Sequence, residues 1–343
     1  MQEPRTAPRR GWVLLGAKLL LALLLLGWLA HSGALAPGAL LKGKVAASAL
    51  GTAALCVLVA LVLGVYRWRL VMAALGVPMR YPRALQVYWI GAFAGTFLPG
   101  AATGDMLRAV YVARETPQAR ARAAASVVID RVFGLLGFVL SGLVLLLMRF
   151  DALRQSAGLR DLATGFVVAL VAVAVCLPAA VWLVQRVAGT DLLARARDRV
   201  VRTRRAVRMQ AAAVGWPGMT QAATVLGLSL AIPTLLACAL LPFIAGEAFP
   251  AASVIDIGIA SNAAQVANTL PLTPGGIGIG EGAFEYVLSL LRQPAAVAGY
   301  ATAFLSLRLV TVAVNAFGGV LLLLPGNRAG ARAAGVQAVG SGR

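Results

Sequence analysis

The sequence is poor in acidic residues and in the side chains that bind metals. Only 12 of its 343 residues are Asp or Glu, against 31 Lys and Arg, and it has a single histidine, His31. Its three cysteines, Cys56, Cys176 and Cys238, all fall within apolar runs and show neither CxxC spacing nor a disulfide pattern. Zinc and haem would therefore find almost no ligands, and we expect no metal site and no cofactor.

Charged residues of both signs are also too few for a soluble protein. They make up 13% of the chain, hydrophobic residues make up 60%, and the mean hydropathy is +0.85. A soluble domain needs roughly a quarter charged residues to cover its surface. The basic residues lie between apolar runs, where they set membrane orientation, so we expect no nucleic-acid partner. The sequence predicts an all-α integral membrane protein.

Six apolar stretches are long enough to cross a bilayer, which takes about 20 residues. They are residues 12–30, 45–65, 123–148, 162–184, 220–245 and 295–324. The first is too long for a signal-peptide core and is expected to stay as a membrane anchor.

Two further apolar stretches are interrupted. Residues 84–113 break at Pro99-Gly100, and residues 253–292 break at Pro274-Gly275-Gly276 and Gly278. A helix does not run smoothly through proline and glycine. Each stretch is therefore predicted to be a re-entrant helical hairpin or, alternatively, a broken crossing.

The arginines decide between these alternatives for the first hairpin. If residues 84–113 return to the side from which they enter, 22 basic residues, Arg67 and Arg108 among them, lie in cytoplasmic segments and six lie outside. If they cross, the eight arginines of 186–208 face outward, against the positive-inside bias. For the second hairpin, only the three arginines near the C-terminus test whether the segment re-enters or crosses. Its topology is therefore less strongly determined. Both termini are expected to be cytoplasmic.

With both hairpins re-entrant, each half of the chain crosses three times, which predicts an inverted-topology repeat of residues 12–150 and 162–324. Three positions of the first half match positions of the second half at a nearly constant spacing. These matches support the repeat, although three of them can arise by chance. The matched positions, 175 to 177 residues apart, are Pro99-Gly100 with Pro274-Gly275, Asp105 with Glu281, and Arg131 with Arg308.

A basic linker, residues 186–218, lies within the second half. One interpretation is an amphipathic helix whose arginines, at 186–208, bind anionic headgroups. The alternative is a solvated loop that only fixes topology. Residues 325–343 are expected to be a disordered tail.

The broken hairpins point to a transport site, because non-helical backbone at membrane depth survives only against protein or a water-filled cavity. The second helix of each hairpin is expected to begin near Asp105 and Glu281, where free N–H groups suit an anion. Alternatively, both carboxylates merely cap their own helices. Asp256 and Glu285 are further candidates, although shallow positions near the hairpin ends explain them equally well.

Asp130, Arg131 and Arg308 lie within apolar runs, where each charge costs about 2.5–3.5 kcal/mol. Asp130 and Arg131 point about 100° apart on a helix and need not pair with each other. Arg131 could reach Asp105 or Glu281, or hold a lipid phosphate; a purely structural ion pair is the alternative. The predicted site residues are Pro99, Gly100, Gly104, Asp105, Arg108, Asp130, Arg131, Pro274, Gly275, Gly276, Gly278, Glu281 and Arg308.

No familiar catalytic motif is present: the chain has no GxSxG elbow, no phosphate-binding GxxxxGK[ST] loop and no HExxH. Its longest polar segment, about 30 residues, is too short for a soluble catalytic domain. We expect no enzyme activity from the chain itself.

Several motifs resemble those of a known family, the transmembrane, flippase-like region of lysylphosphatidylglycerol synthases and their stand-alone bacterial relatives. The resemblance covers residues 12–324, with departures at Gly95-Thr96 and Gly280. It rests on Tyr66-Arg67-Trp68-Arg69, Phe97-Leu98-Pro99-Gly100, Gly104-Asp105, Arg108-Ala109, Ser126, Asp130-Arg131, Gly134, Pro274-Gly275-Gly276-Ile277-Gly278 and Glu281-Gly282.

The resemblance implies translocation of a lipid, a phospholipid or a polyisoprenoid-type lipid, across the bacterial inner membrane. Lipid synthesis is not implied, because the synthase domain of the family has no counterpart here. Two alternatives stay open at this point. One is a membrane enzyme or accessory factor in lipid-linked sugar, isoprenoid or aminoacyl-lipid metabolism; the other is a scaffold that recruits a partner through its basic loop.

Overall fold

The computed structural model describes residues 47–97, 103–187, 215–244, 253–270, 273, 276–292 and 299–323, together with residues 20, 27 and 31. Over these ranges the chain is helical and forms no strand, which confirms the predicted all-α class. Most of the first predicted span, most of the basic linker and the predicted disordered tail fall outside them.

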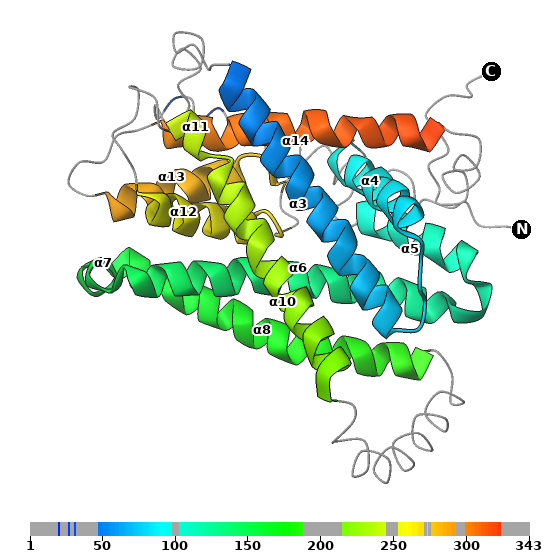
Figure 1. Cartoon of the computed structure of the whole chain (residues 1–343). Helices are drawn as coiled ribbons and strands as arrows, with labels where there is room; N and C mark the ends of the chain where they lie inside the picture. The colour runs from blue at the N-terminus through cyan, green and yellow to red at the C-terminus, as the bar shows by residue number, and fades with distance from the viewer. Residues whose placement is uncertain are drawn as a thin grey trace, which may run out of the picture.

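The helices of the described ranges follow one another without any intervening sheet (Figure 1). In chain order they are α3 (Ala47–Ala74), α4 (Tyr81–Phe97), α5 (Thr103–Glu115), the 3-10 turn η1 (Pro117–Ala119), α6 (Arg120–Met148), α7 (Phe150–Gln155), α8 (Ala157–Val187), α10 (Gly215–Cys238), α11 (Leu241–Ile244), α12 (Val254–Ala267), α13 (Ile279–Leu291) and α14 (Tyr300–Leu323).

In the part of the chain that the structure describes, five helical segments are long and apolar enough to cross a membrane. They are Ser48–Ala74, Arg120–Met148, Ala157–Val175, Thr220–Ile244 and Tyr300–Leu322. They match the second to sixth predicted spans, with one correction: α3 continues to Ala74 instead of ending at residue 65. The extension carries Arg67 and Trp68 into the helix.

The outer surface is apolar, as lipid contact requires. On α8, Val168, Val171 and Val175 are 61%, 57% and 64% exposed, and Leu147 and Met148 of α6 are more than half exposed as well. A soluble protein rarely exposes so continuous an apolar face. The side chains that avoid lipid must therefore face inward.

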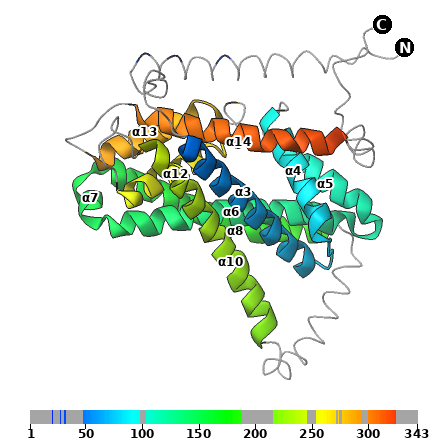
Figure 2. The same ribbon diagram turned by 45° about the horizontal axis from the view of Figure 1, so that its top comes forward.

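Four of the described helices have between 13 and 17 residues and are too short to span. Crossing needs about 20 residues, but α4, α5, α12 and α13 have 17, 13, 14 and 13. The helices α4 and α5 pack against each other, and so do α12 and α13. In Figures 1 and 2 these two helix pairs, the first and second hairpins, lie on opposite sides of α3.

Glycines set the close spacing of the first hairpin. Gly91 and Gly95 lie one turn apart on α4, in the GxxxG spacing that lets two helices approach closely. They face Gly104 near the start of α5, where an added Cβ would lie 2.3 Å from the Gly91 carbonyl oxygen. Any side chain at residue 104 would push the two helices apart.

The helix contacts keep the same pattern when the two halves of the chain are exchanged. The first hairpin packs through α4 on α14, and the second packs through α12 on α6. Likewise α5 packs on α6, α13 packs on α14, and α3 packs on α10. This is the pattern that two halves related by a two-fold axis would give, and the predicted repeat remains a prediction.

We expect Gly104→Ala to destabilise the protein. The added methyl group would overlap the Gly91 carbonyl, and overpacking of this kind costs about 1–3 kcal/mol. The midpoint of thermal unfolding in detergent, followed by tryptophan fluorescence, should fall.

Gly227→Ala on α10 is the matched control, because nothing lies within 4 Å of a Cβ added there. This variant should unfold at or above the wild-type temperature, since alanine is the better helix former. Equal midpoints for both variants would mean that Gly104 does not set the spacing of α4 and α5.

Candidate functional site

A cavity of about 440 Å³ lies between the two hairpins. On one side it is lined by α4, α5 and α6, and on the other by α12, α14 and the segment that leads into α13. Its charged lining residues are Asp105, Arg108, Arg131 and Arg308. The cavity therefore lies between the two helix pairs that the broken segments form.

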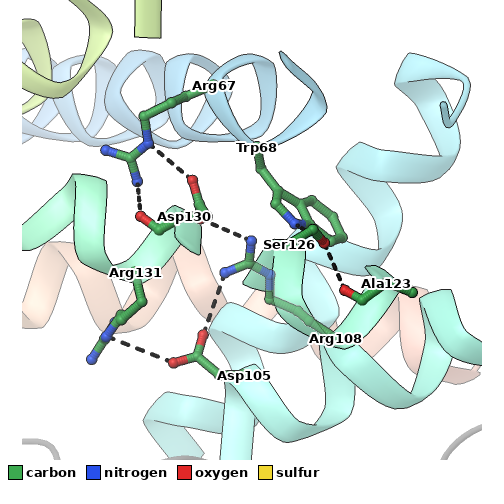
Figure 3. A network of polar contacts seen from close by, with 8 residues as sticks. All are labelled: Arg67, Trp68, Asp105, Arg108, Ala123, Ser126, Asp130 and Arg131. Carbon is green, nitrogen blue, oxygen red and sulfur yellow. Dashed lines mark hydrogen bonds and ion pairs between the residues drawn. The ribbon is translucent and has the colours of Figure 1, made fainter. Parts of the chain in front are cut away.

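A chain of alternating charges forms the wall on the side of the first hairpin (Figure 3). Asp130 is at its centre: Oδ1 accepts a hydrogen bond from Arg67 Nε at 2.9 Å, and Oδ2 accepts one from Arg108 Nη2 at 3.0 Å. Arg108 Nη1 then donates to Asp105 Oδ1 at 3.3 Å. Arg131 Nε lies 3.6 Å from Asp105 Oδ2, at the end of the chain.

Burial of these charges increases toward Asp130. Asp130, Arg67 and Arg108 are 2%, 5% and 6% exposed, whereas 62% of the Arg131 side chain is exposed. Removing such groups from water costs several kcal/mol per ion unless opposite charges and hydrogen bonds compensate. Three arginines face two aspartates here, so one positive charge is left over, and Arg131 is the arginine held most loosely.

Arg108 is fixed further by two aromatic rings. Its Cζ lies 4.3 Å from the ring centroid of Trp68 and 4.2 Å from that of Tyr88, within the range of cation–π attraction. The Trp68 indole N–H donates to Ser126 Oγ at 3.2 Å, which holds this ring in place. Arg108 is therefore a rigid part of the wall.

The second hairpin presents a compact clamp around one arginine. Arg308 Nε donates to Glu281 Oε1, and Nη2 donates to Asn268 Oδ1 at 3.1 Å and to the Gly276 carbonyl at 3.2 Å. Glu281 is fully buried and also accepts the Gly278 N–H at 2.8 Å. Glu281 therefore caps its own helix and binds Arg308 at the same time.

Most described members of the predicted site come together. Those that line the cavity are Gly104, Asp105, Arg108, Arg131, Gly276 and Arg308. Asp130, Gly278 and Glu281 lie behind these and hold them through the contacts above. Pro99, Gly100, Pro274 and Gly275 lie outside the described residues.

Two candidate carboxylates lie elsewhere. Asp256 forms a two-pronged ion pair with Arg149, at 2.6 and 2.7 Å. Glu285 accepts the N–H groups of Gly299 and Ala301 at the start of α14, at 3.1 and 2.7 Å. Neither lines the cavity. In the described part of the chain no three His, Cys, Asp or Glu side chains gather as a metal site would need.

Two arginines that were counted in cytoplasmic segments turn out to be buried within the helix bundle. Arg67 and Arg108 lie inside helices and are almost fully buried, because each pairs with Asp130. Sequence reasoning also missed the roles of Asn268 and Thr273, both of which line the cavity. Apolar residues follow Arg69 in the sequence, and they were the available sign that α3 continues past Arg67 and Arg69.

The fold and the cavity define a polytopic, all-α membrane protein whose short helix pairs enclose a charged interior. The family model "Lysylphosphatidylglycerol synthase TM region" matches residues 15–338, nearly the whole chain, and the protein belongs to this family. The comparison with individual curated proteins gives no match.

We expect Asp130→Asn to be strongly destabilising. The substitution keeps the shape of the side chain but leaves Arg67 and Arg108 buried without their shared counter-charge, which costs about 3–5 kcal/mol. Thermal unfolding in detergent should show a large drop in the midpoint.

Glu115→Gln is the control, because Glu115 pairs with Arg83 at 2.6 Å while both side chains are about one-third exposed. A pair of this kind contributes at most about 1 kcal/mol. Comparable losses in the two variants would contradict the central place of Asp130.

Proposed function

We propose that this protein moves a lipid with an anionic or polar headgroup across the bacterial inner membrane without changing it covalently. Membership of a membrane family whose relatives are flippase-like supports the proposal. The observation that carries it is the cavity between the hairpins, in which Arg131 is the one loosely held cation of the described wall.

Arg131 is the residue proposed to hold the headgroup. Its contact with Asp105 is long, at 3.6 Å, and most of its side chain is exposed. A guanidinium can donate two parallel hydrogen bonds to a phosphate, and such charge-assisted bonds are about twice as strong as neutral ones. A lipid phosphate therefore needs to displace only a weak internal contact.

Exposed apolar side chains beside Arg131 would let the acyl chains of the lipid extend from the cavity into the bilayer. Val128 lies three residues earlier on the same face of α6 and is 48% exposed, and Met106, next to Asp105 on α5, is 65% exposed. A headgroup at Arg131 can thus remain attached to chains that stay in the bilayer. Only the polar part of the lipid has to enter the cavity.

The two halves differ in how tightly each holds its arginine, which fits alternating access. Arg308 is clamped, with 16% of its side chain exposed, while Arg131 is open. In the proposed cycle one half rocks against the other, so that the Arg131–Asp105 contact tightens as the Arg308–Glu281 contact loosens. The cavity would then open to the other leaflet.

The paired carboxylates argue against acid–base catalysis in this cavity. A general acid or base must be free to exchange a proton with the substrate. Asp105, Asp130 and Glu281 are each bound to at least one arginine, and the last two are buried behind the lining. A role in binding and transport needs no free carboxylate and is therefore compatible with these ion pairs.

We expect Arg131→Ala to slow lipid translocation about tenfold or more, because a hydrogen bond to a charged group is worth about 1.5–3 kcal/mol. The measurement is the rate at which fluorescent phospholipids in reconstituted liposomes become accessible to an external quencher.

Arg160→Ala is the control, since Arg160 is an exposed arginine at the start of α8 and does not line the cavity. It should translocate lipid at the wild-type rate. Equal rates for wild type and Arg131→Ala would remove Arg131 from the mechanism, and a wild-type rate no faster than that of protein-free liposomes would refute transport itself.

A further inference from the structure

An amide side chain fills the space beside the arginine of the second hairpin. Asn268 Oδ1 accepts a hydrogen bond from Arg308 Nη2 at 3.1 Å, and a Cβ added to Gly280 would overlap the same oxygen. Gly280 directly precedes Glu281, the acid that holds Arg308. The side chain of Asn268 therefore extends from Gly280 to the arginine.

In the first hairpin a glycine, Gly95, takes the corresponding position. The residue before the hairpin acid is again a glycine, Gly104, and a Cβ added to it would lie 3.0 Å from the Gly95 nitrogen and 3.1 Å from the Gly95 Cα. Gly104 thus packs on Gly95 as Gly280 packs on Asn268. Gly95 has no side chain that could extend toward Arg131, so the space beside this arginine is left open.

The open space at Gly95 belongs to the cavity. Gly95 is exposed, and it lines the cavity together with Arg131. The atom nearest to a Cβ added at Gly95 would be the Gly104 Cα, at 3.8 Å, which is an ordinary van der Waals contact. The position therefore has room for a side chain that glycine does not supply.

A buried hydroxyl on the opposite side of the cavity indicates how far a ligand reaches. Thr273 lines the cavity and is 4% exposed, and its hydroxyl has no hydrogen-bond partner among the described residues. Leaving a buried hydroxyl without a partner is unfavourable, so a polar group of a ligand is expected to bind it. A ligand that contacts both Arg131 and Thr273 has to extend across the cavity.

We propose that Gly95 sets the size of the headgroup that the site accepts, and that the site takes bulky polar headgroups in preference to a bare phosphate. This role of Gly95 rests on the proposed function and adds a size class of substrate. The phosphate binds at Arg131, and the group attached to it lies over Gly95 and extends toward Thr273. Gly95 discriminates by bulk, and not between hydroxyl and amine groups.

The volume of the cavity agrees with this size class. It is about 440 Å³, within the range of pockets that hold drug-sized molecules and more than a phosphate group alone would fill.

The test compares three phosphodiester lipids that share the same acyl chains and a single negative charge but differ in headgroup size. They are phosphatidylmethanol, phosphatidylglycerol and phosphatidylinositol. Binding to the purified full chain is measured by native mass spectrometry in an uncharged detergent. Wild type should bind phosphatidylinositol at least about threefold more tightly than phosphatidylmethanol, because the larger headgroup adds a hydrogen bond to Thr273.

Gly95→Leu fills the open space without adding a group that competes for Arg131. We expect it to bind phosphatidylinositol at least about tenfold more weakly than wild type does, because the new side chain overlaps a large headgroup. Binding of phosphatidylmethanol should stay within about twofold of wild type. Gly95→Ala should give an intermediate loss. Neither variant should unfold at a lower temperature, since the added Cβ has room and both residues are better helix formers than glycine.

Gly51→Leu is the matched control, because Gly51 is an exposed residue of α3 outside the cavity lining, and nothing lies within 4 Å of a Cβ added there. It should bind all three lipids as wild type does. The role of Gly95 is refuted if Gly95→Leu keeps wild-type binding of phosphatidylinositol or loses all three lipids equally. It is also refuted if wild type binds phosphatidylmethanol as tightly as phosphatidylinositol.

Translocation of the same lipids in liposomes separates this proposal from the proposed function. Size-dependent binding without any translocation would contradict transport alone. Translocation of phosphatidylinositol by Gly95→Leu at the wild-type rate would contradict the role of Gly95 alone.

Discussion

The burial of one carboxylate, Asp130, constrains the rest of the first half. Inside a bilayer no water is available to solvate a charge, so Asp130 persists only because Arg67 and Arg108 reach it from two other helices. The helices α3, α5 and α6 are thereby fixed against one another. Arg108, held in addition between Trp68 and Tyr88, then positions Asp105 at the cavity. The loose hold on Arg131 follows, because Asp105 shares its charge with Arg108.

If the predicted repeat holds, the second half lacks part of the set of charges found in the first. With the spacing that relates Asp105 to Glu281 and Arg131 to Arg308, Phe284 takes the place of Arg108, and Leu307 takes the place of Asp130. Both are buried apolar residues, and Phe284 stacks on Phe304. Glu281 therefore pairs with Arg308 alone among the described arginines, and Arg308 is held tightly. The two acid–arginine pairs thus differ: Arg131 is held loosely beside Asp105, and Arg308 is held tightly by Glu281.

The sequence predicted most of the spans and marked the hairpin acids and the arginines of the following helices as candidate partners, because ionisable residues inside apolar runs are conspicuous and must find partners. It could not show which partners. Arg67 and Asp130 are 63 residues apart, and only the packing of α3 on α6 brings them together. Arg67 also follows the most hydrophobic part of its apolar run, so the sequence suggested that it lies in a loop. Thr273 and Asn268 carry no charge, and nothing in their local pattern marks them as lining a cavity.

The account rests on the claim that a lipid headgroup enters the space between the hairpins. Photochemical labelling tests this most directly: the protein is reconstituted with a phospholipid that carries a diazirine in its headgroup, irradiated, digested and mapped by mass spectrometry. We predict labels on cavity-lining residues of α5, α12 and the segment before α13, such as Asp105, Gln265 and Thr273. Labels confined to the ends of lipid-facing helices such as α8, with none in the cavity, would contradict the account.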